Sequence, residues 1–453
     1  MVRQQIRDEI HASGMISIVA DTTPDIVKRE QLSIVARYLK FSSSTYEFEI
    51  KERVLDIVEV ETKTALDCFN GIENVLNKMN ITWPMVIGQC YDNGSNMTGH
   101  IKGVRALVQG RNPAALFVAC NAHTLDLVGK SLQDSSIFAL KLFESIASLY
   151  SFFNDSQQRW HRLGVHLMSI SKTRWSYRHL SARAVKNNLP VVLENLLYQS
   201  ENATGDARTK LETQTKAASL FSYFSSSEAM IMLRFWIHVT GLLQEANLKF
   251  QDIQATLVTQ IRVLDDTKQA IAQIDCEEEI QLALEEASYI DGFKDNLEDI
   301  YDSSHVMTRA ERARVSKHQK IAFARQLLID EMNEVIDYAT SEIDDRFYHL
   351  ESIFTMFNPI LTSDQSDAEV IAAAAKFHEL DPSLDSDILV NEHSAFFATY
   401  QHHMSASEIL ELIRSDKLPF YSLAKVVQWF LSIATSSASC ERVFSKQGCY
   451  LCK

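Results

Sequence analysis

The sequence predicts an α/β sheet domain that is interrupted by a long all-helical insertion and closed by a C-terminal helical segment. Three observations indicate this fold class. Short apolar or alternating runs, separated by turn signals, fill residues 16–60. Amphipathic helical stripes fill most of residues 134–360. The 453 residues include only 13 glycines and 7 prolines, and so few helix breakers over this length point to long helices.

The first part of the chain alternates strands with helices. Residues 16–20 form a short apolar run, residues 31–39 alternate, and residues 53–60 are half apolar and β-branched, so an antiparallel meander is expected. The alternating run places four side chains on one face: Leu32, Ile34, Ala36 and Tyr38. A helix over about 62–79, a strand over 85–90, a short helix and a strand over 115–120 follow. This order suits a ribonuclease-H-like mixed sheet.

Composition excludes several classes of protein. With 46% hydrophobic and 23% charged residues, the chain is not mainly disordered. The net charge of −15 argues against a protein that coats nucleic acid by charge alone, because such proteins bind through Lys/Arg–phosphate contacts. The seven cysteines are scattered, so a disulfide framework is not expected. We find no signal peptide and no apolar run long enough for a membrane span, and we expect a soluble intracellular chain.

Two later segments each leave two interpretations open. Residues 277–302 are strongly acidic and residues 309–325 strongly basic. The basic run either contacts DNA phosphates or forms a solvated face paired with its acidic neighbour. A helix over about 421–436 carries an apolar stripe that is either a dimerisation face or internal packing. The stripe consists of Leu423, Val426, Val427 and Phe430.

Two carboxylates close predicted strands. Asp21 follows the first apolar run and Asp92 follows the strand at 85–90. Ligands of α/β sheets bind at the C-terminal ends of strands, and hard cations such as Mg²⁺ take oxygen ligands. The pair is therefore a candidate for a metal site, although an aspartate at a strand end is also an ordinary turn or N-cap residue.

Five motifs stand in order between residues 18 and 445. They are Ile18-Val19-Ala20-Asp21-Thr22-Thr23, Cys90-Tyr91-Asp92-Asn93-Gly94-Ser95-Asn96-Met97, Cys120-Asn121-Ala122-His123-Thr124-Leu125-Asp126-Leu127, Thr173-Arg174-Trp175 and Ser436-Ser437-Ala438-Ser439-Cys440-Glu441-Arg442-Val443-Phe444-Ser445. Together they resemble the hAT superfamily of transposases, and within it the transposon-derived zinc-finger MYM-type proteins most closely. The resemblance covers nearly the whole chain.

The resemblance implies a catalytic triad of Asp21, Asp92 and Glu441, with Asp25 in reserve for the first position. It also implies DNA cleavage and strand transfer with Mg²⁺ or Mn²⁺, action on transposon ends as a homodimer or higher oligomer, and a nuclear location. His123, Arg174 and Trp175 would assist at the DNA end. We expect no zinc, because Cys120 and His123 have no second Cys/His pair nearby.

The implied organisation has three parts. Residues 1–133 form the first part of the ribonuclease-H-like core, residues 134–395 the helical insertion, and residues 396–453 a C-terminal hAT dimerisation segment that completes the core. The zinc-binding module and the further C-terminal helix that the family usually carries do not fit this chain, so we expect both ends to be clipped. Two functions therefore remain open: a Mg²⁺-dependent transposase, active or decayed, and a domesticated interaction module that no longer cuts DNA.

Overall fold

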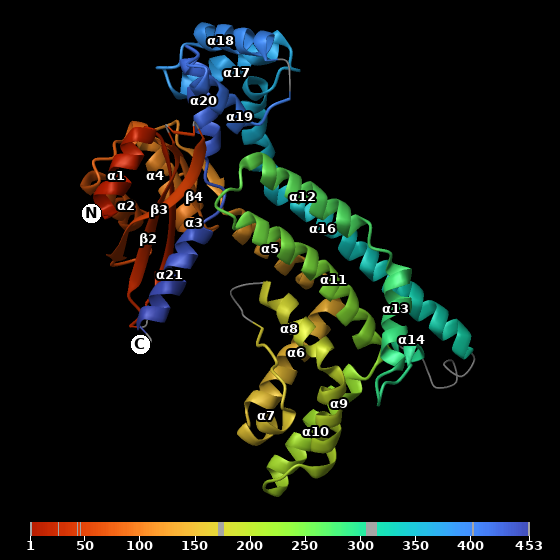
Figure 1. Cartoon of the computed structure of the whole chain (residues 1–453). Helices are drawn as coiled ribbons and strands as arrows, with labels where there is room; N and C mark the ends of the chain where they lie inside the picture. Colours follow the sequence, from red (N-terminus) through yellow and green to blue (C-terminus); the bar gives the residue numbers. More distant parts are fainter. Residues whose placement is uncertain are drawn as a thin grey trace. The chain divides into compact units, whose positions relative to one another are not determined.

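The structure is a computed structural model, and it describes residues 2–25, 27–42, 44–45, 47–170, 176–304, 315–400 and 403–451, with side chains as far as residue 444 and without the side chain of residue 176. The chain divides into two compact units (Figure 1). The first unit comprises residues 1–124, 247–264 and 346–453, and the second comprises residues 125–246 and 265–345. These divisions fall at other points than 133 and 395, the boundaries expected from the sequence.

The first unit is built on one five-stranded mixed sheet with the strand order β3-β2-β1-β4-β5. β1 pairs antiparallel with β2 and parallel with β4, while β2–β3 is antiparallel and β4–β5 parallel. The antiparallel meander and the two later strands are thus confirmed. The strands are β1 (Ile16–Pro24), β2 (Glu30–Phe41), β3 (Phe48–Val60), β4 (Val86–Tyr91) and β5 (Leu116–Ala119).

One face of the sheet carries an apolar core. All four residues of the predicted alternating face belong to it, together with residues of the helices packed above them: α1, α2 and α4. Thr64 caps the N-terminus of α2, and its hydroxyl accepts a hydrogen bond from the backbone N–H of Asp67. Helices and turns on this side are α1 (Val2–Ser13), α2 (Ala65–Lys78), η1 (Trp83–Met85), α3 (Ser95–Thr98) and α4 (Val104–Arg111).

The other face of the sheet is covered by the last two helices, α20 and α21. Ser17 Oγ donates to the Ser432 carbonyl over 2.7 Å, and a Cβ on Gly88 would lie 2.1 Å from that hydroxyl, so only glycine fits between them. The helix predicted over about 421–436 is present as α20 and ends at Ser432, and a further helix, α21, follows it from Ala438. The C-terminal helices are α17 (Asp367–Leu380), α18 (Ser386–Thr399), α19 (Ala406–Ser415), α20 (Tyr421–Ser432) and α21 (Ala438–Leu451).

The second unit is helical, as the sequence predicted for this region. Its core is rich in aromatic residues, with Trp236 fully buried and packed edge-on against Phe143. Its own helices are α6 (Ile137–Asn154), α7 (Gln157–Leu163), α8 (Ser176–Asn187), α9 (Leu189–Asn202), α10 (Ala207–Phe224), α13 (Cys276–Ser288) and α14 (Leu297–Ser304). Four helices contribute to both units: α5 (Asn121–Ser135), α11 (Ser227–Phe250), α12 (Leu257–Ala272) and α16 (Lys317–Leu361).

Within the described residues, no single helix has the length and apolar character needed to cross a membrane. The pair α5 and α6 passes that test only when taken together, and it is bent by 106° at its break.

Candidate functional site

Asp21 and Asp92 lie at the same level on two neighbouring strands. The last register pair between the parallel strands β1 and β4 is Ala20–Tyr91, and each aspartate follows its strand's member of that pair by one residue. Adjacent strands are about 4.8 Å apart, so the two backbone positions lie roughly one strand spacing from each other. Both side chains are half-buried. The two carboxylates predicted to close their strands are therefore neighbours at the level where β4 ends. Asp92 directly follows β4, whereas β1 continues to Pro24, so Asp21 lies within its strand.

The chain after Asp92 makes a tight turn fixed by side chains. The backbone N–H of Gly94 approaches Asp92 Oδ1 at 3.4 Å, and Asn93 Nδ2 donates to Thr124 Oγ1 over 3.0 Å. A Cβ at Gly94 would lie 3.3 Å from Asp92 Oδ1 and 2.8 Å from Asn96 Oδ1, so a side chain there would push the carboxylate away. His123, half-buried in the first turn of α5, adjoins Thr124 and so lies beside this turn.

The beginning of α21 is attached to the same edge. Asn121 N–H donates to the Thr435 carbonyl over 3.0 Å, and Ser437 N–H donates to Cys120 Sγ over 3.2 Å. Cys440 Sγ approaches the carbonyl of Ser33 at 3.8 Å, and Ser33 is the register partner of Asp21 on β2. The first turn of α21, which carries Glu441, therefore packs against the ends of β1, β2 and β5.

The pKa values of two buried thiols, Cys440 and Cys120, are influenced by nearby carboxylates. Burial raises the pKa of the Cys440 thiol well above its ordinary value, and the Asp21 carboxylate adds to that rise. Burial also raises the pKa of Cys120, which Ser437 opposes by hydrogen bonding, and the charge of Glu441 contributes to the rise. The Asp21 charge therefore acts on Cys440, and the Glu441 charge acts on Cys120, at the start of α21. Among the described residues, however, no three His, Cys, Asp or Glu side chains are gathered as a metal-binding group.

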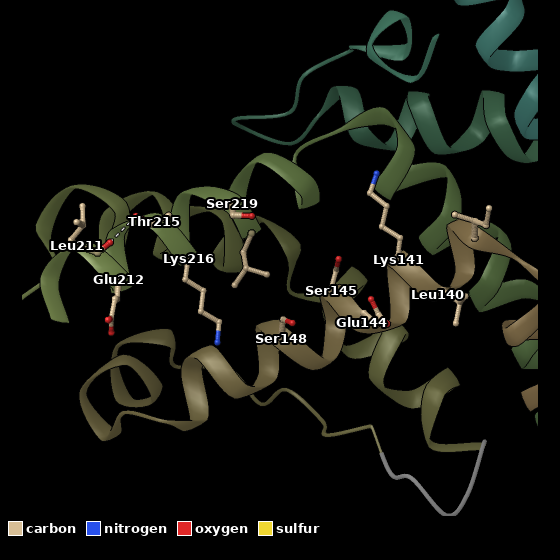
Figure 2. A pocket seen from close by; sticks show the side chains of 12 residues that line it. Leu140, Lys141, Glu144, Ser145, Ser148, Leu211, Glu212, Thr215, Lys216 and Ser219 are labelled. Carbon is tan, nitrogen blue, oxygen red and sulfur yellow. Dashed lines mark hydrogen bonds between the residues drawn. The ribbon is translucent and has the colours of Figure 1, made fainter. Parts of the chain in front are cut away.

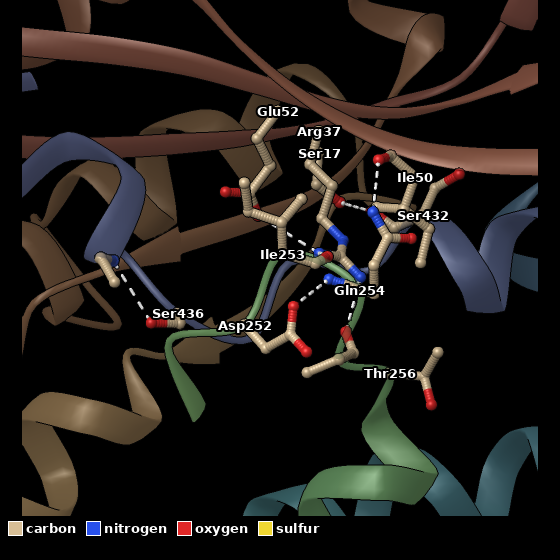
Figure 3. Close-up of polar contacts among 12 residues, drawn as sticks. Ser17, Arg37, Ile50, Glu52, Asp252, Ile253, Gln254, Thr256, Ser432 and Ser436 are labelled. Carbon is tan, nitrogen blue, oxygen red and sulfur yellow. Dashed lines mark hydrogen bonds and ion pairs between the residues drawn. The ribbon is translucent and has the colours of Figure 1, made fainter. Parts of the chain in front are cut away.

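A buried ion-pair cluster holds α21 and the α11–α12 turn on the sheet (Figure 3). Arg37 is 2% exposed; it donates over 2.7 Å to the carbonyl of Ile253 and over 2.7 Å to that of Ala255, and its Nη1 lies 3.2 Å from Glu52 Oε1. Burial lowers the pKa of Arg37, and Glu52 opposes that shift by charge and hydrogen bonding. The cluster therefore pairs a cation on β2 with an anion on β3 beneath the turn.

The same glutamate reaches α21. Arg442, the residue after Glu441, lies with Nη2 3.5 Å from Glu52 Oε2 and donates through Nη1 to the Gln251 carbonyl over 2.9 Å. Because adjacent helical residues are fixed in direction relative to one another, this contact sets the rotation of α21 and with it the direction of Glu441. We call Arg37, Glu52 and Arg442 the buried clamp after its two buried members, Arg37 and Glu52; the side chain of Arg442 is 40% exposed. Sequence reasoning missed it, although a charged residue within the alternating apolar run of β2 was a visible signal.

The remaining predicted residues fall elsewhere. Asp25, the reserve carboxylate, accepts through Oδ1 from the N–H groups of Val27 and Arg29 at 2.9 and 2.8 Å, which is a turn role. Arg174 and Trp175 lie outside the described residues. Of the basic run, the described cations Lys317, Lys320 and Arg325 pair with acidic side chains of 277–302, and its positions 309–314 also lie outside them.

The stripe proposed for dimerisation packs inside the chain. Its four residues, Leu423, Val426, Val427 and Phe430, are at most 2% exposed. Phe430 contacts Phe357 at a ring separation of 5.2 Å, and the adjacent Trp429 donates from Nε1 to the Ile87 carbonyl over 3.0 Å. Of the two interpretations left open, internal packing describes these contacts, and a role in dimerisation would need α20 to change its packing.

A pocket of about 900 Å³ lies between α6 and α10 of the second unit, and none of the three predicted carboxylates lines it (Figure 2). Lys141 and Lys216 line it with several serines and aliphatic side chains. Lys141 forms an ion pair with Glu228 at 2.6 Å. Its open, mixed lining contains no arrangement of catalytic groups, so it does not replace the sheet edge as the candidate site.

Comparison with known families bears on the first part of the chain. Residues 1–103 match the family described as DUF4371: ZMYM1/FAM200, RNase-like domain. The match supports a ribonuclease-H-like fold and relates this region to transposon-derived ZMYM1/FAM200-type proteins. It contains Asp21 and Asp92 but ends before Glu441 and α21.

Proposed function

We propose that the sheet edge carrying Asp21, Asp92 and Glu441 is the active site of an hAT-type, transposase-derived protein that cleaves and joins DNA strands. The register of Asp21 and Asp92 on adjoining parallel strands carries this proposal. The start of α21, fixed at the same edge by Cys120 and Ser33, supports Glu441 as the third carboxylate.

The oxygen donors of this edge are of the kind that Mg²⁺ and Mn²⁺ prefer. Asp21 and Asp92 would hold the ion from the two strands, and Glu441 would complete the set from α21. A bound ion would supply charge stabilisation at a phosphodiester and would lower the pKa of attacking water. The donor chemistry fits, whereas the described side chains are not drawn together as a three-residue group, so the three carboxylates would have to move closer to one another to hold an ion.

Other residues would serve the DNA. His123 is half-buried beside the Asp92 turn and would donate a hydrogen bond to a phosphate. Arg174 would contact phosphate and Trp175 would stack on an unpaired base, which is worth about 1–3 kcal/mol. Transposon ends as the substrate, a homodimer or higher oligomer, and a nuclear location belong to the same proposal.

A nicking assay on supercoiled plasmid in the presence of Mn²⁺ tests this activity. We expect the wild-type chain to nick the plasmid, and Asp21→Asn and Asp92→Asn each to lower the rate by at least about a hundredfold. Asp291→Asn, which removes an exposed carboxylate from the second unit, is the matched control and should leave the rate unchanged. Equal rates in all four proteins would reject the site.

The alternative function is a non-catalytic interaction module that keeps the fold. The lack of a gathered metal-binding group among the described side chains favours it, as does the net charge of −15. DNA nicking and Mn²⁺ binding distinguish the two functions. An interaction module would neither nick DNA nor bind Mn²⁺ through Asp92, although it would fold with the same clamp.

A further inference from the structure

A pocket of about 510 Å³ lies in the first unit, at the end of β1 opposite to Asp21. It is walled by residues 13–15 between α1 and β1, residues 413–418 at the end of α19, and residues 420–428 of α20. Asp21 is five residues beyond Ile16, the first residue of β1. At about 3.3 Å per strand residue, the pocket is roughly 15–20 Å from that carboxylate, so it is a separate site.

The pocket is positively charged. Arg414, Lys417 and Lys425 line it, and none of its twelve lining residues is acidic, in a chain that holds 59 acidic residues. Lys425 is neutralised by Asp381 at 2.6 Å. Arg414 and Lys417 have no carboxylate partner within the part of the chain that the structure describes, and the Arg414 guanidinium lies 5.9 Å from the Phe41 ring centre. Two cationic groups are thus available to an anion.

Lys417 adopts a backbone conformation that lysine seldom takes. Its φ is 52°, and it directly follows the last turn of α19. The N–H of Leu418 bonds to the Ile413 carbonyl over 3.0 Å and that of Lys417 to the Arg414 carbonyl over 3.4 Å, which is the pattern of a Schellman motif. Glycine is the favoured residue at this position of the motif. This end of α19 turns the chain at the pocket, so that Lys417 lines it together with Arg414.

The neighbouring groups suit a nucleotide. Tyr421 lines the pocket together with the cations, and 79% of its surface is exposed. Cations bind phosphate through charge-assisted hydrogen bonds, and exposed aromatic rings stack on bases. The volume lies within the range of small-ligand pockets. We propose that this pocket binds a nucleotide unit, with its phosphate group at Arg414 and Lys417 and its base against Tyr421.

Calorimetric titration of the full chain tests this proposal with three probes: inorganic phosphate, thymidine monophosphate and a single-stranded oligonucleotide of six thymidines. We expect the monophosphate to bind more tightly than phosphate, and Arg414→Gln and Lys417→Gly each to weaken both at least threefold. Tyr421→Ala should remove the advantage of the monophosphate. An oligonucleotide that binds more tightly than the monophosphate identifies a strand as the ligand, and one that does not identifies a free nucleotide.

Lys28→Gly is the matched control. Lys28 is also exposed with a φ of 63°, but it lies in the turn between β1 and β2, so the variant loses the same charge and relieves the same kind of strain elsewhere. We expect both glycine variants to raise the melting temperature, and only Lys417→Gly to weaken binding. Wild-type affinity in Lys417→Gly and Arg414→Gln, or an equal loss in Lys28→Gly, would overturn the proposal. Asp92→Asn should bind these probes normally, so this test is independent of the proposed DNA cleavage.

Discussion

Replacing Arg37 by methionine tests whether the buried clamp secures the α11–α12 turn on the sheet. The change removes the donors to the Ile253 and Ala255 carbonyls and leaves both without their side-chain partner. An unsatisfied buried acceptor costs about 1–3 kcal/mol. Loss of one member of a buried ion pair costs about 3–5 kcal/mol, and Arg442 at 3.5 Å still compensates Glu52 in part. We therefore expect the free energy of unfolding to fall by about 3–5 kcal/mol.

Urea unfolding followed by circular dichroism measures this change, and hydrogen exchange of residues 251–256 localises it. The double variant Arg37→Met with Glu52→Leu provides the internal comparison, because removing both charges leaves no unpaired carboxylate. It should be more stable than Arg37→Met alone. A loss below about 1 kcal/mol in the single variant, or no change in exchange at residues 251–256, would show that the clamp does not hold the turn.

Three further outcomes follow from single contacts. Burial raises the pKa of Glu9, but hydrogen bonds from Lys40, Tyr38 and Gln5 outweigh burial and lower the pKa to about 2. The ionised Glu9 therefore stabilises the fold above about pH 4.5, and this contribution is lost as pH falls toward 2. In Glu9→Gln, the free energy of unfolding in urea should depend less on pH over this range. Burial raises the pKa of Glu392, whose carboxylate accepts a hydrogen bond from the Leu423 N–H at 2.8 Å. The contribution of Glu392 to stability therefore declines as pH rises through its folded pKa. Glu392→Gln should remove that decline, and an unchanged dependence of unfolding free energy on pH would contradict the raised pKa. Gly88→Ala should cost about 1–3 kcal/mol, seen as a lower melting temperature, because its Cβ would lie 2.1 Å from Ser17 Oγ. Wild-type stability would mean that the Ser17 hydroxyl can turn away from the added methyl group without loss of its bond to Ser432.

The sheet could be predicted because its signals are local. Alternation in β2 identified its buried face, and the order of strands and helices put Asp21 and Asp92 at one edge. The first helix, α1, was missed because only Ile6 and Ile10 of its residues are buried, which is too weak a stripe to recognise.

The clamp and the nucleotide pocket could not be predicted in the same way. Arg37 donates to backbone carbonyls 216 and 218 residues away, and backbone groups leave no signature in a sequence. The strain at Lys417 depends on how α19 ends, which side-chain patterns do not report. The position of Glu441 was suggested only by a resemblance, since nothing local distinguishes it from a solvated helical glutamate.

Calorimetric titration with Mn²⁺ tests the central claim most directly, using the wild type, Asp21→Asn, Asp92→Asn and Asp25→Asn. If Asp21 and Asp92 form one cation site, each of their variants should lose at least about tenfold in affinity, which is about 1.4 kcal/mol. Asp25→Asn should bind as the wild type does, because that carboxylate accepts the N–H groups of its own turn. Identical isotherms for the wild type and Asp92→Asn, or a loss confined to Asp25→Asn, would contradict the assignment of this edge as the active site.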